Sequence, residues 1–264
     1  MRICVASAAL LLIVGSTVAL SQTGNLPAES STRMELHGRT AAESGAVQKP
    51  AYDLDQFPSD LPIDQISKIA QSAVSEATGA TRSAKDTEIY KKISPAVVLV
   101  GTNDGFGSGS LIDTAGDIVT NWHVVKGYEY VAVVFKPSVE RKEPTRDDIK
   151  RARVIKYDEI ADLALIKASE VPTGRIAVRL GDASEIAVGM DVHAIGHPTG
   201  EAWTYTTGVI SQYRQAYEWQ VEGDPIKHRA DIIRTQTPIN PGNSGGPLLS
   251  DSSSLIGVNS FASR

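Results

Sequence analysis

The chain has 264 residues, of which 41% are hydrophobic and 22% charged, and its formal net charge is −5. This composition excludes a chain that is disordered throughout and a multispan membrane protein. The acidic balance argues against a nucleic-acid partner, because nucleic-acid binders usually carry a large basic face. Glycine is frequent (22 residues) and short runs rich in Val, Ile and Thr recur, which indicates many short strands joined by turns.

Residues 1–21 are predicted to form a secretory signal peptide. Arg2 is the only charge, an apolar stretch follows, and the small residues Ala19 and Ser21 precede a cleavage point before Gln22. A cut after Ala19 fits nearly as well. The apolar stretch is shorter than the roughly 20 residues that a spanning helix needs, which favours cleavage over an uncleaved membrane anchor. We therefore expect an exported protein, periplasmic or secreted, with no stable membrane span after cleavage.

The only cysteine, Cys4, lies in this first segment, so the mature chain is expected to lack disulfides. Residues 22–60 are predicted to be a disordered linker, because only five of them are Leu, Ile, Val or Phe and they cannot offset the entropy of ordering. Residues 61–94 are predicted to be a helical N-terminal extension. Apolar residues recur there at spacings of three and four from Pro62 to Thr78, and a second short helix is expected over Thr87–Ile93.

Residues 95–264 show the periodicity of a series of short strands. No helical segments are predicted between these strands, which favours a β-barrel or a β-sandwich over parallel βαβ units. The charged stretch 137–151 is interpreted as a surface insertion and 212–230 as a loop. Strands are expected at 96–102, 107–113, 117–120, 129–136, 152–157, 162–168, 188–195, 204–212, 231–236 and 254–259.

The sequence GNSGGP at 242–247 carries the strongest chemical signal. Flanking glycines permit a tight turn that exposes the Ser244 hydroxyl and lets a substrate backbone approach. The N–H groups of Gly242 and Ser244 can then converge on one space and stabilise an oxyanion. The alternative is an ordinary Gly/Ser hairpin loop.

A serine nucleophile needs a base and a group that orients the base. His123, in TNWHVV just after a predicted strand, is the best candidate for the general base. Asp162 opens the apolar strand DLALIK, where a buried carboxylate needs a partner. Asp158 and Glu159 are competitors in the more polar turn before that strand.

The order His123, Asp162, Ser244, with these motifs around them, resembles the trypsin-like (chymotrypsin-fold) serine proteases, and most closely their HtrA/Deg branch. The resemblance covers about residues 90–260. It extends to GSGSLID at 107–113, AIGHP at 194–198, TTGVIS at 206–211 and TQTPINPGNSGGPLL at 235–249.

The resemblance implies an all-β fold of two six-stranded antiparallel barrels with the triad in the cleft between them. It also implies peptide-bond hydrolysis through an acyl-enzyme, without metal or cofactor, and adds the Asn243 N–H as a contributor to the oxyanion hole. His197, where family members more often have Asn, is interpreted as a turn residue. His193 is interpreted as structural, and zinc binding by this pair is disfavoured because no matching ligand set accompanies it.

The chain departs from the family pattern in two places. It carries no PDZ domain after the protease segment, and it stops at Arg264, twenty residues after Ser244. We therefore expect a second barrel that is short at its C-terminus and leaves a strand edge open. At the position where relatives that cut after Lys or Arg have Asp, this chain has Pro238, followed by Ile239. These two residues are assigned to a substrate pocket for small or medium apolar side chains.

The leading functional hypothesis is an exported serine endopeptidase acting on polypeptide substrates, including misfolded proteins. The alternative is a non-catalytic or chaperone-like binding protein that keeps the protease fold. Assembly into a homo-oligomer stays open.

Overall fold

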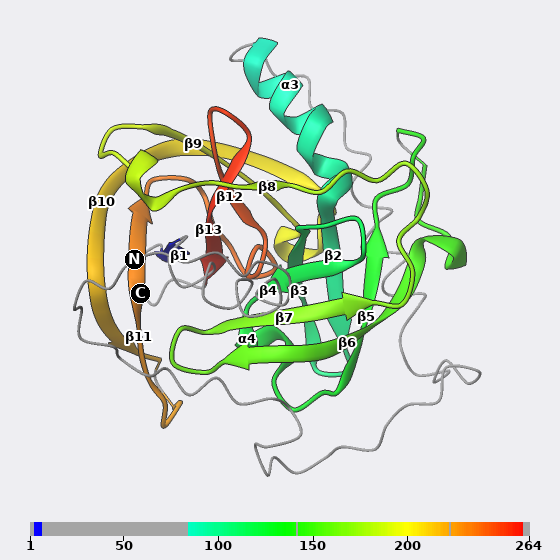
Figure 1. Cartoon of the computed structure of the whole chain (residues 1–264), viewed down its shortest axis with the longest axis horizontal. Coiled ribbons are helices and arrows are strands. Elements are labelled where there is room, and N and C mark those ends of the chain that lie inside the picture. Colours follow the sequence, from blue (N-terminus) through cyan, green and yellow to red (C-terminus); the bar gives the residue numbers. More distant parts are fainter. Residues whose placement is uncertain (1–2, 7–83, 141, 222, 261–264) are drawn as a thin grey trace, which may run out of the picture.

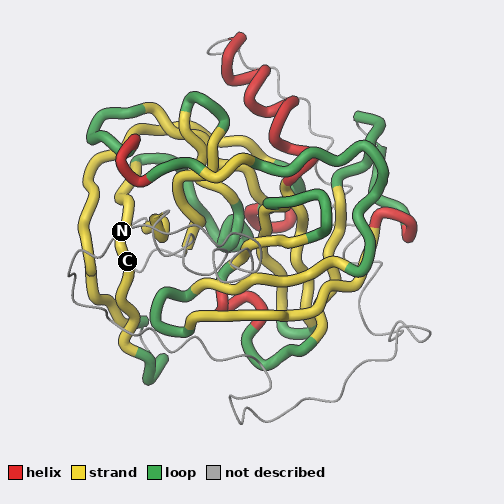
Figure 2. Tube along the Cα trace, in the orientation of Figure 1, coloured by secondary structure: helices red, strands yellow, loops and turns green. Residues whose placement is uncertain are grey.

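The computed structural model describes residues 3–6, 84–140, 142–221 and 223–260, and its side-chain description begins at residue 84. The predicted linker, the helix expected from Pro62 and most of the predicted signal peptide lie outside these ranges. Strands dominate the described part, and the few helices are short (Figures 1 and 2), so the all-β class is confirmed. Within the same ranges, no helix combines the length and apolar character needed to cross a membrane.

The first half of the protease segment forms a closed barrel of six antiparallel strands in the order β2-β3-β4-β7-β6-β5. The short runs of Val, Ile and Leu in these strands supply the apolar side chains of its core. Leu99, Ile118 and Leu165 are among the buried ones. The strands are β2 (Val97–Thr102), β3 (Gly105–Leu111), β4 (Asp117–Thr120), β5 (Tyr130–Phe135), β6 (Ile149–Asp158) and β7 (Leu163–Ala168).

The second half forms a sheet in the order β1-β11-β10-β9-β12-β13-β8, in which β1 also pairs with β13. Six of these strands therefore close on themselves, beside the first barrel (Figure 1). The strands are β1 (Ile3–Ala6), β8 (Arg179–Leu180), β9 (Asp191–Gly196), β10 (Thr204–Gln220), β11 (Lys227–Thr235), β12 (Pro247–Ser250) and β13 (Ser254–Ser260).

Strand β1 occupies the edge that the sequence analysis expects to be open. Its residue Cys4 pairs with Ile233 of β11 on one side and with Asn259 of β13 on the other. The backbone of an unpaired edge attracts another extended segment, and here residues assigned to the signal peptide supply it. In this arrangement the second barrel has six strands, one of which comes from the opposite end of the chain.

The helices are few and lie at the ends of strands. Helix α3 (Ala84–Ile93) covers the predicted second helix of the extension, begins three residues earlier, and packs Ile89 and Ile93 into the main core. The others are η2 (Ser94–Ala96), α4 (Trp122–Val125), η3 (Arg146–Asp148), η4 (Ala183–Glu185) and η5 (Pro198–Gly200).

Three strands extend into segments interpreted from the sequence as irregular. Strand β6 begins at Ile149, inside the predicted surface insertion. Strands β10 and β11 continue through most of 212–230 as a long hairpin. Its register shifts between Arg214 and Tyr217, where Ala216 has φ +48°. This bulge breaks the alternation of side chains, so the strand period is hidden in the sequence.

Candidate active site

His123 lies in the short helix α4, directly after β4, and is held by Asp162 through two hydrogen bonds. The backbone N–H of His123 donates to Asp162 Oδ1 at 2.9 Å, and the Nδ1 atom of the ring lies 2.7 Å from Oδ2. An ionised carboxylate only accepts, so Nδ1 carries the proton and Nε2 is left as the basic nitrogen. The imidazole side chain is 41% exposed, so a substrate can reach it.

Asp162 is buried, with 4% of its surface exposed, and sits just before β7 in the left-handed region at φ +57°. Its carbonyl oxygen accepts hydrogen bonds from the side chain of Asn121 (2.8 Å) and the N–H of Trp122 (3.2 Å). These bonds hold a backbone conformation that is costly for an aspartate. The hydroxyl of Ser260 donates a further bond to Oδ2 at 3.1 Å.

The competing carboxylate, Asp158, has a different task. Its Oδ1 accepts from the N–H groups of Ile160 (2.9 Å) and Ala161 (3.0 Å), which closes the turn before β7. Asp162 is therefore the acid that the structure brings to His123.

Ser244 lies in the loop between β11 and β12, and only 6% of its surface is exposed. Gly242 (φ +99°) and Gly245 (φ +87°) bracket it in backbone conformations that favour glycine. A Cβ atom on Gly242 would collide with the carbonyl oxygen of His197, and one on Gly245 with that of Ser108. Close packing of the loop against both barrels therefore requires these two glycines.

Some backbone N–H groups of this loop already donate a hydrogen bond within the protein, and others do not. The N–H of Asn243 donates to the carbonyl oxygen of Asn240 at 3.0 Å, so this amide is already engaged. Among the described residues, the N–H groups of Gly242 and Ser244 meet no hydrogen-bond acceptor. These two amides are the ones free to bind an incoming oxygen.

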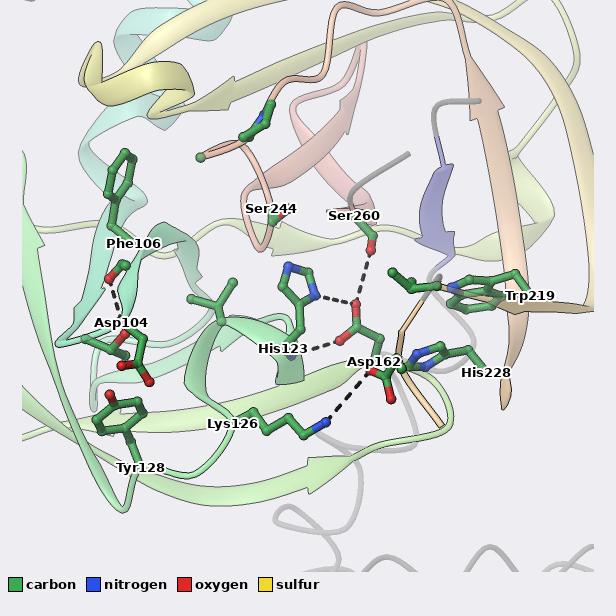
Figure 3. A pocket seen from close by; sticks show the side chains of 17 residues that line it. Asp104, Phe106, His123, Lys126, Tyr128, Asp162, Trp219, His228, Ser244 and Ser260 are labelled. Carbon is green, nitrogen blue, oxygen red and sulfur yellow. Dashed lines mark hydrogen bonds and ion pairs between the residues drawn. The ribbon is translucent and has the colours of Figure 1, made fainter. Parts of the chain in front are cut away.

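Ser244, His123 and Asp162 all line one cavity of about 470 Å³, and the imidazole lies between the other two (Figure 3). Within the described part of the chain, the Ser244 hydroxyl makes no hydrogen bond to the ring, and such bonds often tighten only when substrate binds. The full lining is Thr102, Asp104, Gly105, Phe106, His123, Val124, Lys126, Tyr128, Asp162, Trp219, Val221, Asp224, His228, Pro241, Gly242, Ser244 and Ser260.

The tip of the β10–β11 hairpin forms one wall of this cavity (Figure 3). Trp219 and His228 stack with ring centroids 5.2 Å apart, beside Asp162. His228 Nδ1 lies 3.0 Å from the carbonyl oxygen of Glu159, and Lys126 pairs with Asp224 at 3.8 Å. The hairpin of the second barrel is thus anchored on the first.

Several site residues carry no local signal in the sequence. Ser260 and His228 were not among the candidates, because each reaches the site only through folding. Trp219 lies in the segment 212–230, which the sequence analysis interprets as a loop.

The two residues assigned to a substrate pocket do not line this cavity. Pro238 is exposed and its carbonyl oxygen accepts from Thr206. Ile239 is buried in the smaller hydrophobic cluster that also contains Ile210 and Leu248. Their assignment to substrate specificity stays a prediction.

The remaining histidines divide by burial and position. His37 lies outside the described residues. His193 is buried and bonds Asp251 through Nε2 at 2.9 Å, as a structural residue does. His197 is fully buried and occupies the N-cap position of helix η5, where its side chain makes no capping hydrogen bond. No group of three or more His, Cys, Asp or Glu within the described ranges is arranged to hold a metal.

Comparison with known proteins connects this geometry to a family. Residues 107–258 match the model of the trypsin-like peptidase domain. The chain is 39% identical over 155 residues to Protease Do-like 1 of Arabidopsis thaliana chloroplasts, covering 59% of this chain and 33% of the relative. It is 36% identical over 156 residues to a probable periplasmic DegP-like serine endoprotease of Hahella chejuensis, covering 58% of this chain and 29% of that relative.

The crystal structure of Deg5 is similar over 67% of this chain and 85% of that one, with 31% identity and a TM-score of 0.55. The chain spans about a third of the length of these two curated relatives. Since the family model covers more than half of the chain, the chain belongs to the trypsin-like peptidases, in the branch whose relatives are named Do-like and DegP-like serine proteases.

Proposed function

We propose that this chain is a serine endopeptidase that cleaves polypeptides through an acyl-enzyme. The observation that carries the proposal is the bonded pair of His123 and Asp162 facing Ser244 in one cavity. The two available amides beside the serine give the same cavity a place for an oxyanion.

The reaction follows from the position of each proton. The Ser244 oxygen attacks the substrate carbonyl carbon while its proton passes to Nε2 of His123. Asp162 stabilises the imidazolium that forms, and the N–H groups of Gly242 and Ser244 receive the developing negative charge. His123 then gives its proton to the leaving amine, and water releases the acyl group by the same steps in reverse order.

The cavity favours apolar peptide side chains. Phe106, Tyr128 and Trp219 are among the residues that line it. Export is proposed from residues 1–21, and the DegP-like relative, named as periplasmic, supports it. Misfolded proteins in that compartment are the proposed substrates. The reaction uses no metal, cofactor or thiol, so cleavage should survive EDTA and dithiothreitol.

Replacement of the nucleophile tests the proposal directly. Ser244→Ala should abolish labelling by a fluorophosphonate probe and lower casein cleavage by several orders of magnitude, because triad members act as a unit. The melting temperature should stay near that of the wild type, since only a hydroxyl is lost. Peptide mapping of the labelled wild type should place the adduct on Ser244.

A matched control is Ser250→Ala, a buried serine of β12 whose hydroxyl bonds Ser252 at 2.9 Å, away from the cavity. It should label like the wild type. A folded wild-type chain that neither labels nor cleaves would instead favour the binding-only alternative.

A further inference from the structure

Ser108, on strand β3 of the first barrel, is tied to the nucleophile loop of the second barrel. Its N–H donates to the carbonyl oxygen of Ser244 at 2.7 Å, and its hydroxyl donates to that of Gly242 at 2.7 Å. Its own carbonyl oxygen accepts from the Thr120 hydroxyl at 2.7 Å, which fixes it to β4. Ser108 is fully buried, so water does not compete for these bonds.

The available protons determine which ring nitrogen of His197 is protonated. Nδ1 of His197 lies 2.9 Å from the Ser108 hydroxyl. A hydroxyl has one proton, and that of Ser108 goes to the carbonyl oxygen of Gly242. The contact with His197 therefore needs a proton on Nδ1, donated to the Ser108 oxygen. Nε2 is then unprotonated, and among the described residues it has no hydrogen-bond partner.

The surroundings of His197 keep this state in place. The residue is fully buried, and its ring meets that of Trp203 edge-on, with centroids 5.1 Å apart. Burial lowers the pKa of His197 to about 3, so the ring stays neutral throughout the range in which a protease of this kind works.

The same contacts orient the peptide planes around the nucleophile. In a trans peptide the C=O and N–H point in opposite directions, so fixing one fixes the other. The N–H of Thr199, two residues after His197, donates to the carbonyl oxygen of Pro241 at 3.0 Å, which fixes the plane that carries the Gly242 N–H. The plane that carries the Ser244 N–H lies between the two carbonyl groups that Ser108 holds.

We propose that Ser108 and His197 are positioning residues that hold the carbonyl groups on both sides of the Ser244 N–H, and so keep this amide beside the Gly242 N–H in the arrangement that receives the oxyanion. This inference rests on the proposed peptidase function. Ser108 acts on the loop directly, and His197 acts through Ser108.

The first experiment separates positioning from packing. Ser108→Ala should lower kcat by roughly ten- to a hundredfold while KM changes little, because the bonds it loses act on the transition state. The affinity for a peptide boronate, which mimics the tetrahedral intermediate, should fall by the same factor as kcat/KM. The matched control is Ser110→Ala, two residues along the same strand, also fully buried, whose hydroxyl has no partner among the described residues.

The second experiment tests the donor at position 197. His197→Leu removes the donor at similar volume and should reproduce the loss of kcat. His197→Asn restores an N–H donor and should recover much of it. The double variant Ser108→Ala, His197→Leu should be no slower than Ser108→Ala alone, because His197 acts through Ser108. Melting temperatures of all variants identify any that fail to fold.

A third measurement needs no activity. In histidine ¹⁵N spectra of the Ser244→Ala protein, the ring whose signals disappear in His197→Asn should stay neutral, with its proton on Nδ1, from about pH 8 to about pH 5, a range in which an ordinary histidine titrates. A His197 ring that titrates in this range, or carries its proton on Nε2, would overturn the proposal. So would kcat and boronate affinity in Ser108→Ala equal to those of Ser110→Ala. If the wild-type chain is not labelled by the fluorophosphonate probe, the proposed peptidase function is refuted. In that case the spectra still test the hydrogen bonding of Ser108 and His197 independently of activity.

Discussion

At the scale of single residues, the carboxylate of Asp162 accepts hydrogen bonds from three donors in the cavity. Oδ1 accepts the backbone N–H of His123, and Oδ2 accepts both the ring Nδ1–H and the Ser260 hydroxyl. A buried carboxylate needs hydrogen-bond donors to offset the cost of leaving water. The same bonds aim the imidazole.

Loss of the Ser260 hydroxyl should weaken this arrangement without breaking it. Ser260→Ala removes one of three donors, so kcat should fall roughly tenfold, which corresponds to about 1.4 kcal/mol, while KM changes little. Steady-state kinetics on a peptide substrate measure both. A kcat equal to that of the wild type would show that two donors suffice.

Burial of His197 has a consequence for stability against pH. Its pKa is about 3 in the folded protein and about 6.5 in the unfolded chain, so the unfolded state binds more protons below about pH 6.5. Stability from this residue is therefore complete above about pH 6.5 and is lost as pH falls toward 3, by up to about 1.4 kcal/mol per pH unit.

Urea unfolding at neutral pH and at about pH 5 measures this loss. The wild type should lose more stability on acidification than His197→Asn, which lacks the titrating ring. Carboxylates contribute equally to both proteins, so the difference isolates His197. Equal losses in the two proteins would mean that the ring is solvated in the folded state.

At the scale of elements, the β10–β11 hairpin connects the barrels at the cavity. Its tip is held by the backbone bond from Arg229 to Ile160 (2.8 Å) and by the contact of His228 with Glu159. The rings of Tyr217, Trp219 and His228 stack in succession and form an aromatic ladder at the tip. A wall of this kind can accept substrate side chains without reordering.

Substitution of Trp219 should therefore affect substrate binding more than chemistry. Trp219→Ala removes an apolar wall of the cavity and should raise KM several-fold for peptides with apolar side chains, with a smaller change in kcat. The matched control is Tyr217→Ala, which removes a ring of the same ladder that does not line the cavity. Equal KM values for the two variants would contradict the assignment of this wall to substrate.

At the scale of the whole molecule, the site is shared between the barrels. His123 and Asp162 come from the first barrel, Ser244 from the second, and Ser108 joins the two. The second barrel is closed by β1, which pairs with both β11 and β13. Ile3 of β1 pairs with Ser260, the residue that bonds Asp162, so closure and site are adjacent.

A chain that lacks residues 1–21 should consequently be less stable than the full chain. Removal of β1 leaves backbone groups of β11 and β13 without the partners they have here, which exposes two strand edges. The melting temperature should fall by several degrees and aggregation should increase, measured by calorimetry and light scattering on both forms. Identical melting temperatures would show that the barrel does not depend on β1.

The sequence determined the elements and residues whose signals are local. Runs of Val, Ile and Leu with turns between them predicted most strands of both barrels, and the helix before Pro95 was found with a small error in its start. His123, Asp162 and Ser244 are predicted as catalytic residues because each lies in a short motif with a chemical reason. Most of the contacts that the sequence missed have no such motif.

The hydrogen bonds that hold the site residues in place are visible only in the tertiary structure. Ser260 bonds Asp162 across 98 residues, and Ser108 bonds Gly242 across 134. A hydrogen bond between a hydroxyl and a distant carbonyl leaves no pattern in the neighbouring sequence. Ser108 is therefore predicted only as a strand residue, and His197 only as a turn residue. The bulge at Ala216 hid half of a strand in the same way. The pairing of β1 with two strands near the other end of the chain likewise depends on an edge that exists only once the barrel has formed.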